Sequence, residues 1–331
     1  MTGADGVSRL IRGATQERAW AVVVLQPTLD DLLNGAPPRG FFLAAPERDR
    51  FWADPFPVRD AAGDLWIFVE EYLRWRGLGR IVALRVSETG QVVTRRTVLA
   101  SSHHFSFPQV HLNDGTWVAT VESCDPAAPT YTFTAVGEPW IASLRTLPVG
   151  VIDPAIAIPP PGPTPVVVPD EDDPTTLLDP HGGQDWYLTG TSGSDEFAGF
   201  RQWVAPEGVG WIEQPEVRFR DAVLARPAGN LDLTRGLRST QDCSENYGVA
   251  TSLVTWDPAV PGPGEVRRRI EGTDLSADAL GTHTLAWTPD GAAVVADVWR
   301  RRRQPLSAVH RILEQRHGRL CPGRRESRRM P

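Results

Sequence analysis

The sequence predicts an all-β protein, a five-bladed β-propeller with a short C-terminal helical, Arg-rich tail. Four stretches share one design: an apolar run ends near a proline, a turn follows, and an aromatic residue opens a second apolar run. A fifth, weaker copy lies between the third and the last. Helical periodicity is scarce before the tail. Because one small sheet cannot bury its own face, repetition of such a unit is typical of a propeller.

The first two copies predict paired strands joined by Gly-containing turns. The first has strands at 53–56 and 65–70 around a turn at 63–64, and the second has strands at 107–110 and 116–122 around a turn at 114–115. The β-branched and aromatic residues in these runs favour strands, and Asp-Gly favours a tight turn. Each copy therefore predicts a β-hairpin at the start of a small sheet.

The later copies are less regular. The third has a strand at 152–156 and resumes at 185–188, the weak copy lies at 225–229, and the last has strands at 283–287 and 292–297 around a turn at 290–291. An apolar strand at 20–25 precedes the first copy and is expected to pair with the last sheet, which would remove exposed edges. Residues 159–183 are rich in proline and acidic side chains, which predicts a surface loop.

The predicted organisation is a flexible lead-in at 1–18, a propeller at 19–303 with the insertion loop 159–183, and a basic tail at 304–331. A short amphipathic helix is expected at 306–313. The net charge is -7 although the tail is Arg-rich, so the remaining body is strongly acidic. An acidic body argues against nucleic acid as a partner. The tail could touch RNA or anionic lipid, but a solvated end is the favoured interpretation.

The three cysteines are far apart and form no Cys-x-x-Cys pair, which argues against a disulfide scaffold or a structural zinc site. No run reaches the roughly 18 apolar residues of a membrane span. The N-terminal residues also lack the apolar core of a signal peptide. These features lead us to expect a cytoplasmic protein without a membrane span.

Matched positions in successive blades converge on one central funnel, so separate side chains can form a pocket without a contiguous motif. The matched positions are Asp54, Gln109 with the two residues before it, Asp153, Arg226 and His283. Four of them are ionisable where small or apolar residues would be expected. An Asp-Pro pair can also simply cap the entry to a strand. Its occurrence at two matched places favours a functional interpretation.

Glu122 ends the second strand of its copy, and Glu70 ends the equivalent strand of the first. With Asp54 and Asp153, Glu122 would complete a trio of acids. Glycosyl transfer needs one carboxyl to protonate the leaving oxygen and one carboxylate to activate the attacking group. A third carboxylate raises the pKa of the acid by like-charge repulsion. Trp52, Trp66, Trp75 and Trp117 offer flat faces for sugar rings, or core packing.

Other motifs are incomplete. Residues 190–194 miss the last glycine of a nucleophile elbow, and Gly77-Leu78-Gly79 lacks the third glycine of a dinucleotide loop. His103 and His104 have no carboxylate at metal-ligand spacing, so we expect no metal ligands there and interpret them as loop or substrate-facing residues. No cofactor is required by these patterns.

Several short motifs occur in an order that we associate with one domain: Phe51–Phe56, Glu70-Glu71, His104–Pro108, Val121–Ser123, Asp153-Pro154, Arg226–Gly229, Gln241-Asp242, Tyr247-Gly248 and Gly281–Thr284. They resemble the N-terminal domain of plant glucosamine inositolphosphorylceramide transferases and its bacterial relatives, over about residues 20–300. That domain is in turn similar to the five-bladed propellers of arabinanases, xylosidases and invertases, glycoside hydrolase families 43, 32 and 68.

The resemblance implies roles for individual residues. Asp54 matches the general base of those hydrolases, Glu122 resembles the general acid, and Asp153 resembles the residue that tunes the acid. His283 resembles an axial histidine beside a bound calcium in some arabinanases, so an axial calcium near His283 is implied as an optional ligand. Two departures stand out: no hydrolase signature surrounds Glu122, and the glycosyltransferase domain of the plant proteins is absent from this sequence.

We therefore expect a carbohydrate-active enzyme, glycoside hydrolase-like or of glycosyltransferase type, acting on a glycosidic or sugar-nucleotide bond in glycoconjugate or specialised-metabolite biosynthesis. Asp54, Glu122 and Asp153 are the candidate catalytic residues. Candidate substrate-binding residues are Trp52, Glu70, His104, Gln109, Arg226, Asp242 and His283. The expected partners are a sugar-containing small molecule and an enzyme of the same pathway. The alternatives are a non-catalytic module that binds a glycan or a partner, and a propeller used for a different natural-product reaction.

Overall fold

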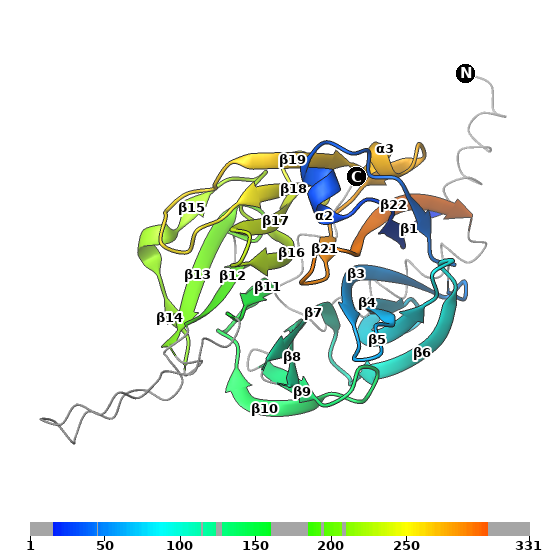
Figure 1. Cartoon of the computed structure of the whole chain (residues 1–331), viewed down its shortest axis with the longest axis horizontal. Helices are drawn as coiled ribbons and strands as arrows, with labels where there is room; N and C mark the ends of the chain where they lie inside the picture. The colour runs from blue at the N-terminus through cyan, green and yellow to red at the C-terminus, as the bar shows by residue number, and fades with distance from the viewer. Residues whose placement is uncertain are drawn as a thin grey trace, which may run out of the picture.

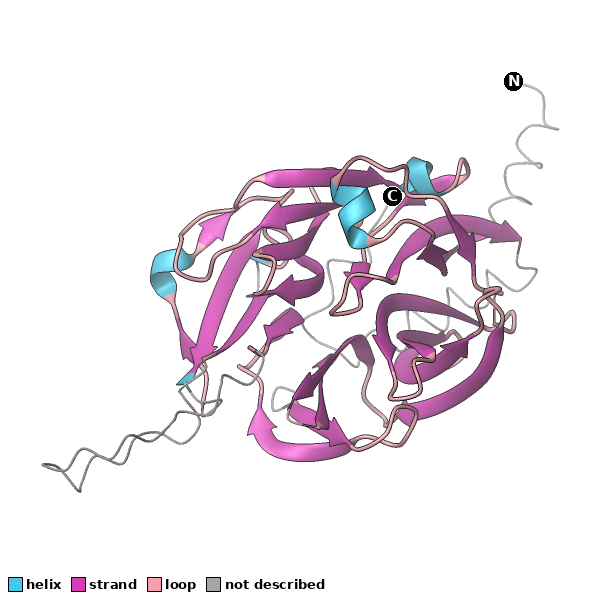
Figure 2. Cartoon of the chain, in the orientation of Figure 1, coloured by secondary structure: helices cyan, strands magenta, loops and turns pink. Residues whose placement is uncertain are grey.

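The computed structural model describes residues 16–44, 46–113, 115–123, 128–159, 185–192, 195–206 and 210–303. Within these ranges the protein is nearly all-β, with two short α-helices, α2 (Leu29–Leu33) and α3 (Gly272–Leu275), and one 3-10 helix, η3 (Pro215–Val217). Figure 2 shows strands joined by loops and turns, with only short helical segments. The predicted helix at 306–313, the tail, the first fifteen residues of the lead-in and most of the insertion loop lie outside the described residues.

Two four-stranded antiparallel sheets come from the first two sequence copies. The first sheet has the order β3 (Arg50–Arg59), β4 (Leu65–Leu73), β5 (Leu78–Val86) and β6 (Val92–Leu99). The second has the order β7 (Phe105–Asn113), β8 (Thr116–Ser123), β9 (Pro129–Phe133) and β10 (Ile141–Thr146). Residues 66–72 of β4 are buried without a break because neighbouring elements cover both of its faces, whereas β10 is exposed at its sheet edge.

The third copy begins a sheet of β11 (Val151–Ala157), β12 (Trp186–Ser192), β13 (Gly199–Ala205) and β14 (Ile212–Glu213), with β15 (Phe219–Arg220) also paired to β13. A larger sheet combines two antiparallel groups. One contains β16 (Pro227–Asp232), β17 (Leu237–Asp242), β18 (Ala250–Thr255) and β19 (Val266–Glu271). The other contains β20 (Ala279–Gly281), β21 (Leu285–Trp287), β22 (Val294–Arg303), β1 (Gln16–Leu25) and β2 (Gly40–Phe42). A single parallel pair, Gly229 with Leu285, joins the groups.

The N-terminal strand pairs with the last sheet, as the sequence predicts. β1 runs antiparallel to β22 from Gln16 opposite Arg303 to Leu25 opposite Val294. β1 therefore starts three residues before the predicted domain boundary at residue 19. No helix among the described residues has the length and apolar character needed to cross a membrane.

One strand of each antiparallel group, namely β3, β7, β11, β16 or β21, lies toward the middle of the molecule (Figure 1). Contacts lead from β3 to β7, from β7 to β11, from β11 to β16, from β16 to β21, and from β21 back to β3. The other strands of each group extend outward from this central set. Residues at equivalent places in the five central strands therefore face one region.

Three central strands share an unusual backbone feature. Asp54, Phe107 and Asp153 have φ angles of 50°, 51° and 48°, and each precedes a proline. The strand register shifts at all three places. A positive φ is rare for residues other than glycine, and a β-bulge redirects the side chains around it. The three repeats thus bend alike where the candidate site residues lie.

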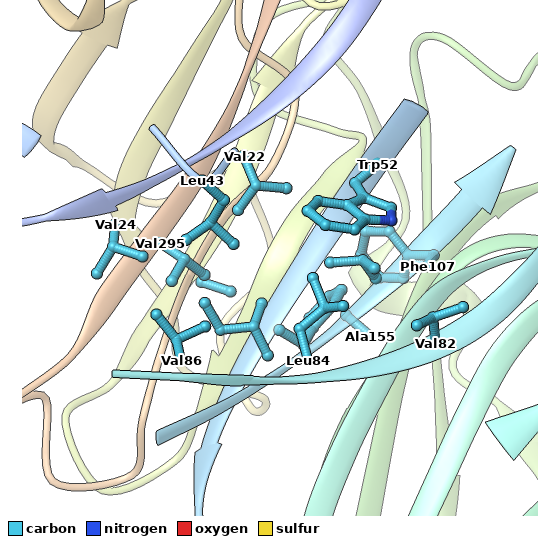
Figure 3. Packing of buried hydrophobic residues seen from close by; sticks show 14 of the residues in the cluster. Val22, Val24, Leu43, Trp52, Val82, Leu84, Val86, Phe107, Ala155 and Val295 are labelled. Atoms are coloured by element: carbon cyan, nitrogen blue, oxygen red, sulfur yellow. The ribbon is translucent and has the colours of Figure 1, made fainter. Parts of the chain in front are cut away.

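A buried apolar cluster lies beside this bent region. It includes Trp52 and Phe56 of β3, Phe107 of β7, Ala155 of β11 and Val295 of β22. Figure 3 labels Trp52, Phe107, Ala155 and Val295 among the side chains that separate strands contribute to this cluster. Full burial of a Val or Phe side chain stabilises the folded state by roughly 1.5–3 kcal/mol. The central strands are consequently held by a common apolar core next to the polar site.

Candidate functional site

Asp54, Glu122 and Asp153 come together from three strands. Asp54 lies on β3, Glu122 on β8 and Asp153 on β11, and all three are buried. Phe107 donates its amide N–H to Asp54 Oδ2 at 3.1 Å, and Asp153 donates its amide N–H to Glu122 Oε2 at 3.4 Å. The side chains of Asp54 and Asp153 remain 7% and 6% exposed, whereas that of Asp297 is 0% exposed. The two predicted catalytic aspartates thus retain a solvent-facing edge that Asp297 lacks.

His283 bridges Asp54 and Asp297. Its Nε2 lies 2.9 Å from Asp54 Oδ1, and its Nδ1 lies 2.8 Å from the carboxylate of Asp297. Thr284 adds a hydroxyl hydrogen bond to Asp54 Oδ1 at 3.1 Å. The segment from Thr282 to Thr284 precedes β21, so the hairpin of β21 and β22 brings His283 and Asp297 side by side.

Electrostatics fix the charges of this group. Burial favours the neutral form of Asp54, but the His283 imidazolium and the Phe107 amide outweigh it and hold the pKa of Asp54 below its ordinary value. Burial alone would lower the pKa of His283, yet the carboxylates of Asp297 and Asp54 raise it to about 10. Asp54 is therefore an anion and His283 a cation near neutral pH.

Asp153 is part of a second group with Glu122 and Arg226. Arg226 Nε donates to Asp153 Oδ2 at 2.6 Å, and Gln241 Nε2 donates to the same oxygen at 3.1 Å. Burial raises the pKa of Asp153 to about 8; Glu122 adds repulsion and a carboxyl–carboxyl hydrogen bond, while the Arg226 guanidinium opposes the increase. Two carboxyls that share a hydrogen bond titrate as a pair. The pair therefore retains a proton near neutral pH.

Aromatic rings border both groups. Trp20 on β1 lies over the His283 ring, with centroids 3.8 Å apart, and Tyr247 lies 5.2 Å from it. The Arg226 guanidinium lies 5.0 Å from the Tyr247 ring centroid. Tyr247 thereby contacts the two cations at once, and burial raises its pKa well above the ordinary value, which keeps its hydroxyl neutral. The aromatic contacts reduce the desolvation cost of both cations.

Four other predicted residues lie in different surroundings. His104 accepts a hydrogen bond from the Gly79 amide at 2.9 Å, and its Nε2 lies 3.3 Å from Glu70 Oε1. Trp52 is a core residue whose indole N–H donates to Glu71 at 3.1 Å. Gln109 is fully buried and pairs with the backbone of Ile156.

Asp242 forms an ion pair with Arg269 at 2.8 Å. Burial opposes the charge of Asp242, but hydrogen bonds from Ser244 and Arg269 lower its pKa. The structure thus brings together the three predicted catalytic acids with Arg226 and His283. It places Trp52 and Gln109 in packing roles and Glu70 and His104 in a separate pair.

The sequence interpretation missed several members of the cluster. Asp297 was read only as part of an apolar strand, yet it is fully buried beside His283. A charged residue within the run Val294–Val298 was the available signal, because a buried carboxylate requires a partner. Gln241, Tyr247 and Trp20 also contact the cluster. Gln241 and Tyr247 occur in motifs that carry the resemblance, and Trp20 opens the predicted strand at 20–25, but no local pattern assigns a site role to any of the three.

Asp54, His283 and Asp297 have ligand atoms within 4.8 Å of one another, so they are the candidate metal-binding group among the described residues. Calcium prefers six to eight oxygen ligands. Here both oxygens of each carboxylate already accept hydrogen bonds from N–H or O–H groups of the protein. The third residue, His283, offers two ring nitrogens, and each of them already faces a carboxylate. This donor set does not fit the calcium ion implied by the resemblance.

No protein-family model matches the chain, and no curated protein sequence matches it. Among solved structures, it is similar to an exo-β-1,3-galactanase from Phanerochaete chrysosporium with β-1,3-galactotriose, at 13% identity, 84% coverage of this chain and a TM-score of 0.47. The chain spans 64% of the length of that galactanase chain.

Two further structures are similar at comparable levels. A family 117 glycoside hydrolase from Zobellia galactanivorans is 9% identical, with 85% of this chain and 90% of that chain covered and a TM-score of 0.44. A glycosyl hydrolase from Bacteroides ovatus is 8% identical, with 83% and 93% covered and a TM-score of 0.45.

Proposed function

We propose that this protein is a five-bladed β-propeller enzyme that cleaves or transfers a glycosidic or sugar-nucleotide bond by carboxylate acid/base chemistry. The propeller is supported by the five antiparallel strand groups and by the order of contacts among β3, β7, β11, β16 and β21. The three carboxyls come from different groups and meet beside these strands. That convergence is what circular repetition of a sheet produces.

One observation carries the proposal: Asp54 is ionised, whereas the neighbouring Asp153–Glu122 pair holds a proton. Asp54 has a lowered pKa, whereas the pKa of Asp153 in its pair with Glu122 is raised to about 8. A pair of acids with separated pKa values can divide the roles of base and acid at one pH. Bond cleavage at an acetal carbon requires this division.

Individual roles follow from the contacts. Asp54 is the base, because His283 keeps it ionised. Arg226 favours the charged form of Asp153. The Asp153–Glu122 pair holds the transferable proton. Within this pair Glu122 is the proposed acid and Asp153 the residue that tunes it, as the sequence resemblance implies. Arg226, Asp242, His104 and His283 stay candidates for orienting the substrate, and a biosynthetic, cytoplasmic setting with a partner enzyme stays a prediction from the sequence.

Amide substitutions test the proposed chemistry. We expect Glu122→Gln and Asp54→Asn each to lower turnover by roughly 10²–10⁴-fold, the range that general acid or base catalysis contributes. Turnover is measured on a panel of 4-nitrophenyl glycosides and uridine diphosphate sugars, with product analysis by mass spectrometry. Asp64→Asn, which changes an exposed carboxylate paired with Arg85, is the matched control and should retain full activity.

Circular dichroism and thermal unfolding establish that each variant is folded, which matters most for Asp54→Asn because this carboxylate also accepts the Phe107 amide. Wild-type rates in folded Asp54→Asn and Glu122→Gln would remove both residues from the mechanism.

A glycan-binding module is the second candidate, and one observation favours it. Both oxygens of Asp54 accept hydrogen bonds from the protein, which is what a purely architectural carboxylate would show. Under this interpretation, calorimetry would detect binding of a panel sugar to the wild-type protein without turnover. Glu122→Gln would then weaken binding with no reaction to lose.

A further inference from the structure

The His283 side chain occupies the meeting point of three separate elements. Asp54 reaches it from β3, Asp297 from β22 and Trp20 from β1. We propose that His283 is an imidazolium at neutral pH and acts as the built-in cation of this centre, so that Asp54, His283 and Asp297 work without a metal ion. This protonation state is a property of the folded protein and does not depend on the proposed enzymatic activity.

With both carboxylates ionised, the hydrogen-bond geometry requires two protons on the ring. Nε2 lies 2.9 Å from Asp54 Oδ1, and Nδ1 lies 2.8 Å from the Asp297 carboxylate. A neutral imidazole carries only one N–H, so one nitrogen lone pair would face a carboxylate oxygen at hydrogen-bond distance. Only the imidazolium donates to both partners. The tautomer question that usually accompanies histidine does not arise here.

The buried charges are balanced only when His283 is cationic. Asp297 is completely buried, and Asp54 is nearly so. Each unpaired carboxylate in such a place would cost several kcal/mol. The described elements around the ring contribute Asp54, Asp297 and Tyr247 as titratable neighbours, and Tyr247 stays neutral because its pKa is raised. The His283 cation therefore faces two anions and a neutral phenol.

The aromatic surroundings also suit a cation. The Trp20 ring lies over the imidazole with centroids 3.8 Å apart and an interplanar angle of 33°. A cation over the face of tryptophan is attracted by the negative face of the ring. Behind the ring, a Cβ atom added at Gly248 would lie 2.8 Å from His283 Cβ, so the backbone approaches as closely as it can. The Trp20 ring and the Gly248 backbone thus pack closely against His283.

Every oxygen of the two carboxylates already accepts a hydrogen bond from the protein. Asp297 Oδ1 accepts the amide N–H groups of His283 and Thr284, and its Oδ2 accepts the amide N–H of Asp54. Asp54 Oδ2 accepts the Phe107 amide. Calcium prefers six to eight oxygen ligands, whereas His283 places only ring nitrogens between the two carboxylates. The imidazolium supplies the positive charge instead.

His283 is accordingly a positioning residue. It keeps Asp54 ionised and oriented, and it ties β3 to β22 through one side chain. Because Trp20 belongs to β1, its ring lies over His283 only when the N-terminal strand pairs with β22. Closure of the last strand group and the ionisation of Asp54 are therefore coupled.

Nitrogen-15 NMR of histidine side chains in the full-length protein tests the proposal directly. We expect the His283 ring to show two protonated nitrogens at pH 8, where an exposed histidine is more than nine-tenths neutral. The signal is assigned by its loss in His283→Gln and, should that variant fail to fold, by the nuclear Overhauser contact with the Trp20 ring in the wild-type protein.

Calcium is the second arm of the experiment. We expect the His283 signals to be unchanged between 1 mM EDTA and 5 mM CaCl₂ at pH 7.5. Calcium bound elsewhere, seen as a thermal shift with unchanged His283 signals, leaves this centre metal-free and agrees with the proposal. A neutral ring at pH 8, or loss of a ring proton on addition of calcium, would overturn it.

Discussion

Asp54 accepts the amide N–H of Phe107, and its own amide N–H donates to Asp297. Asp153 repeats this arrangement by donating its amide to Glu122. Asp54, Phe107 and Asp153, the described residues other than glycine with a positive φ, thus each donate their amide N–H to a carboxylate from a neighbouring strand group. Since a positive φ of this kind costs of order 1–3 kcal/mol, the charge-assisted hydrogen bonds offset the strain. The same carboxylates that could perform chemistry also hold the backbone bent.

Glu71 shows how a buried carboxylate outside the site behaves. Its side chain is 0% exposed and accepts hydrogen bonds or ion pairs from Trp52, Arg80 and Arg95. We expect Glu71→Gln to destabilise the protein by about 1–3 kcal/mol, because it removes the counter-charge of half-buried guanidinium groups and their charge-assisted hydrogen bonds. Urea unfolding measures the change.

The matched control is Asp64→Asn, whose partner Arg85 is 41% exposed. This exposed pair should contribute only about 0–1 kcal/mol. Equal losses in the two variants would mean that burial of the Glu71 network does not determine its contribution.

At the scale of elements, the hairpins could be predicted from short local patterns. The strand pairs β3–β4, β7–β8 and β21–β22 follow the aromatic and apolar runs around their turns. The bend at Asp54, Phe107 and Asp153 could not be predicted, because a residue before proline ordinarily adopts an extended conformation. The bulge arises from contacts between strand groups, which local sequence does not encode.

Gly229 joins the two halves of the largest sheet. Its φ is 155°, and it pairs in parallel with Leu285. A Cβ atom there would lie 2.1 Å from the Leu285 carbonyl oxygen, so Gly229→Ala must separate β16 from β21. We expect a loss of about 3 kcal/mol or more, measured by urea unfolding, which exceeds the roughly 1 kcal/mol of an ordinary glycine replacement.

Gly63→Ala provides the comparison. Gly63 has a φ of 85° and nothing within 4 Å of its added Cβ, so only the backbone penalty applies. If Gly229→Ala were no more destabilising than Gly63→Ala, the parallel junction would not hold the two strand groups together.

At the scale of the whole molecule, repetition predicted which residues could meet but not how they are paired. Asp54, Asp153, Arg226 and His283 were recognisable because they occupy matched places in the copies. Their partners Asp297 and Gln241 come from second strands whose register is set by tertiary pairing. Charge state depends on these partners, so it could not be assigned from the sequence.

The charges of the cluster make the stability of the whole protein depend on pH. The pKa of His283 is raised to about 10 in the fold, so its contribution is complete below its unfolded pKa of about 6.5 and is lost as pH rises to 10. Asp153 has the same sign, because its raised pKa, about 8, makes its contribution decrease from about pH 4 to pH 8. Asp54 acts in the opposite direction, since its lowered pKa removes stability in acid.

We therefore expect the melting temperature to be highest in mildly acidic buffer and to fall continuously from about pH 6.5 to pH 10. Differential scanning calorimetry across this range measures the profile. His283→Gln removes the titrating cation, so its profile should be flatter than that of the wild-type protein between pH 8 and pH 10, where Asp153 contributes little further change. Parallel melting-temperature profiles for the two proteins would show that the proton of His283 does not stabilise the fold. The contribution of His283 would then come from its strand contacts and not from the positive charge that we assign to it.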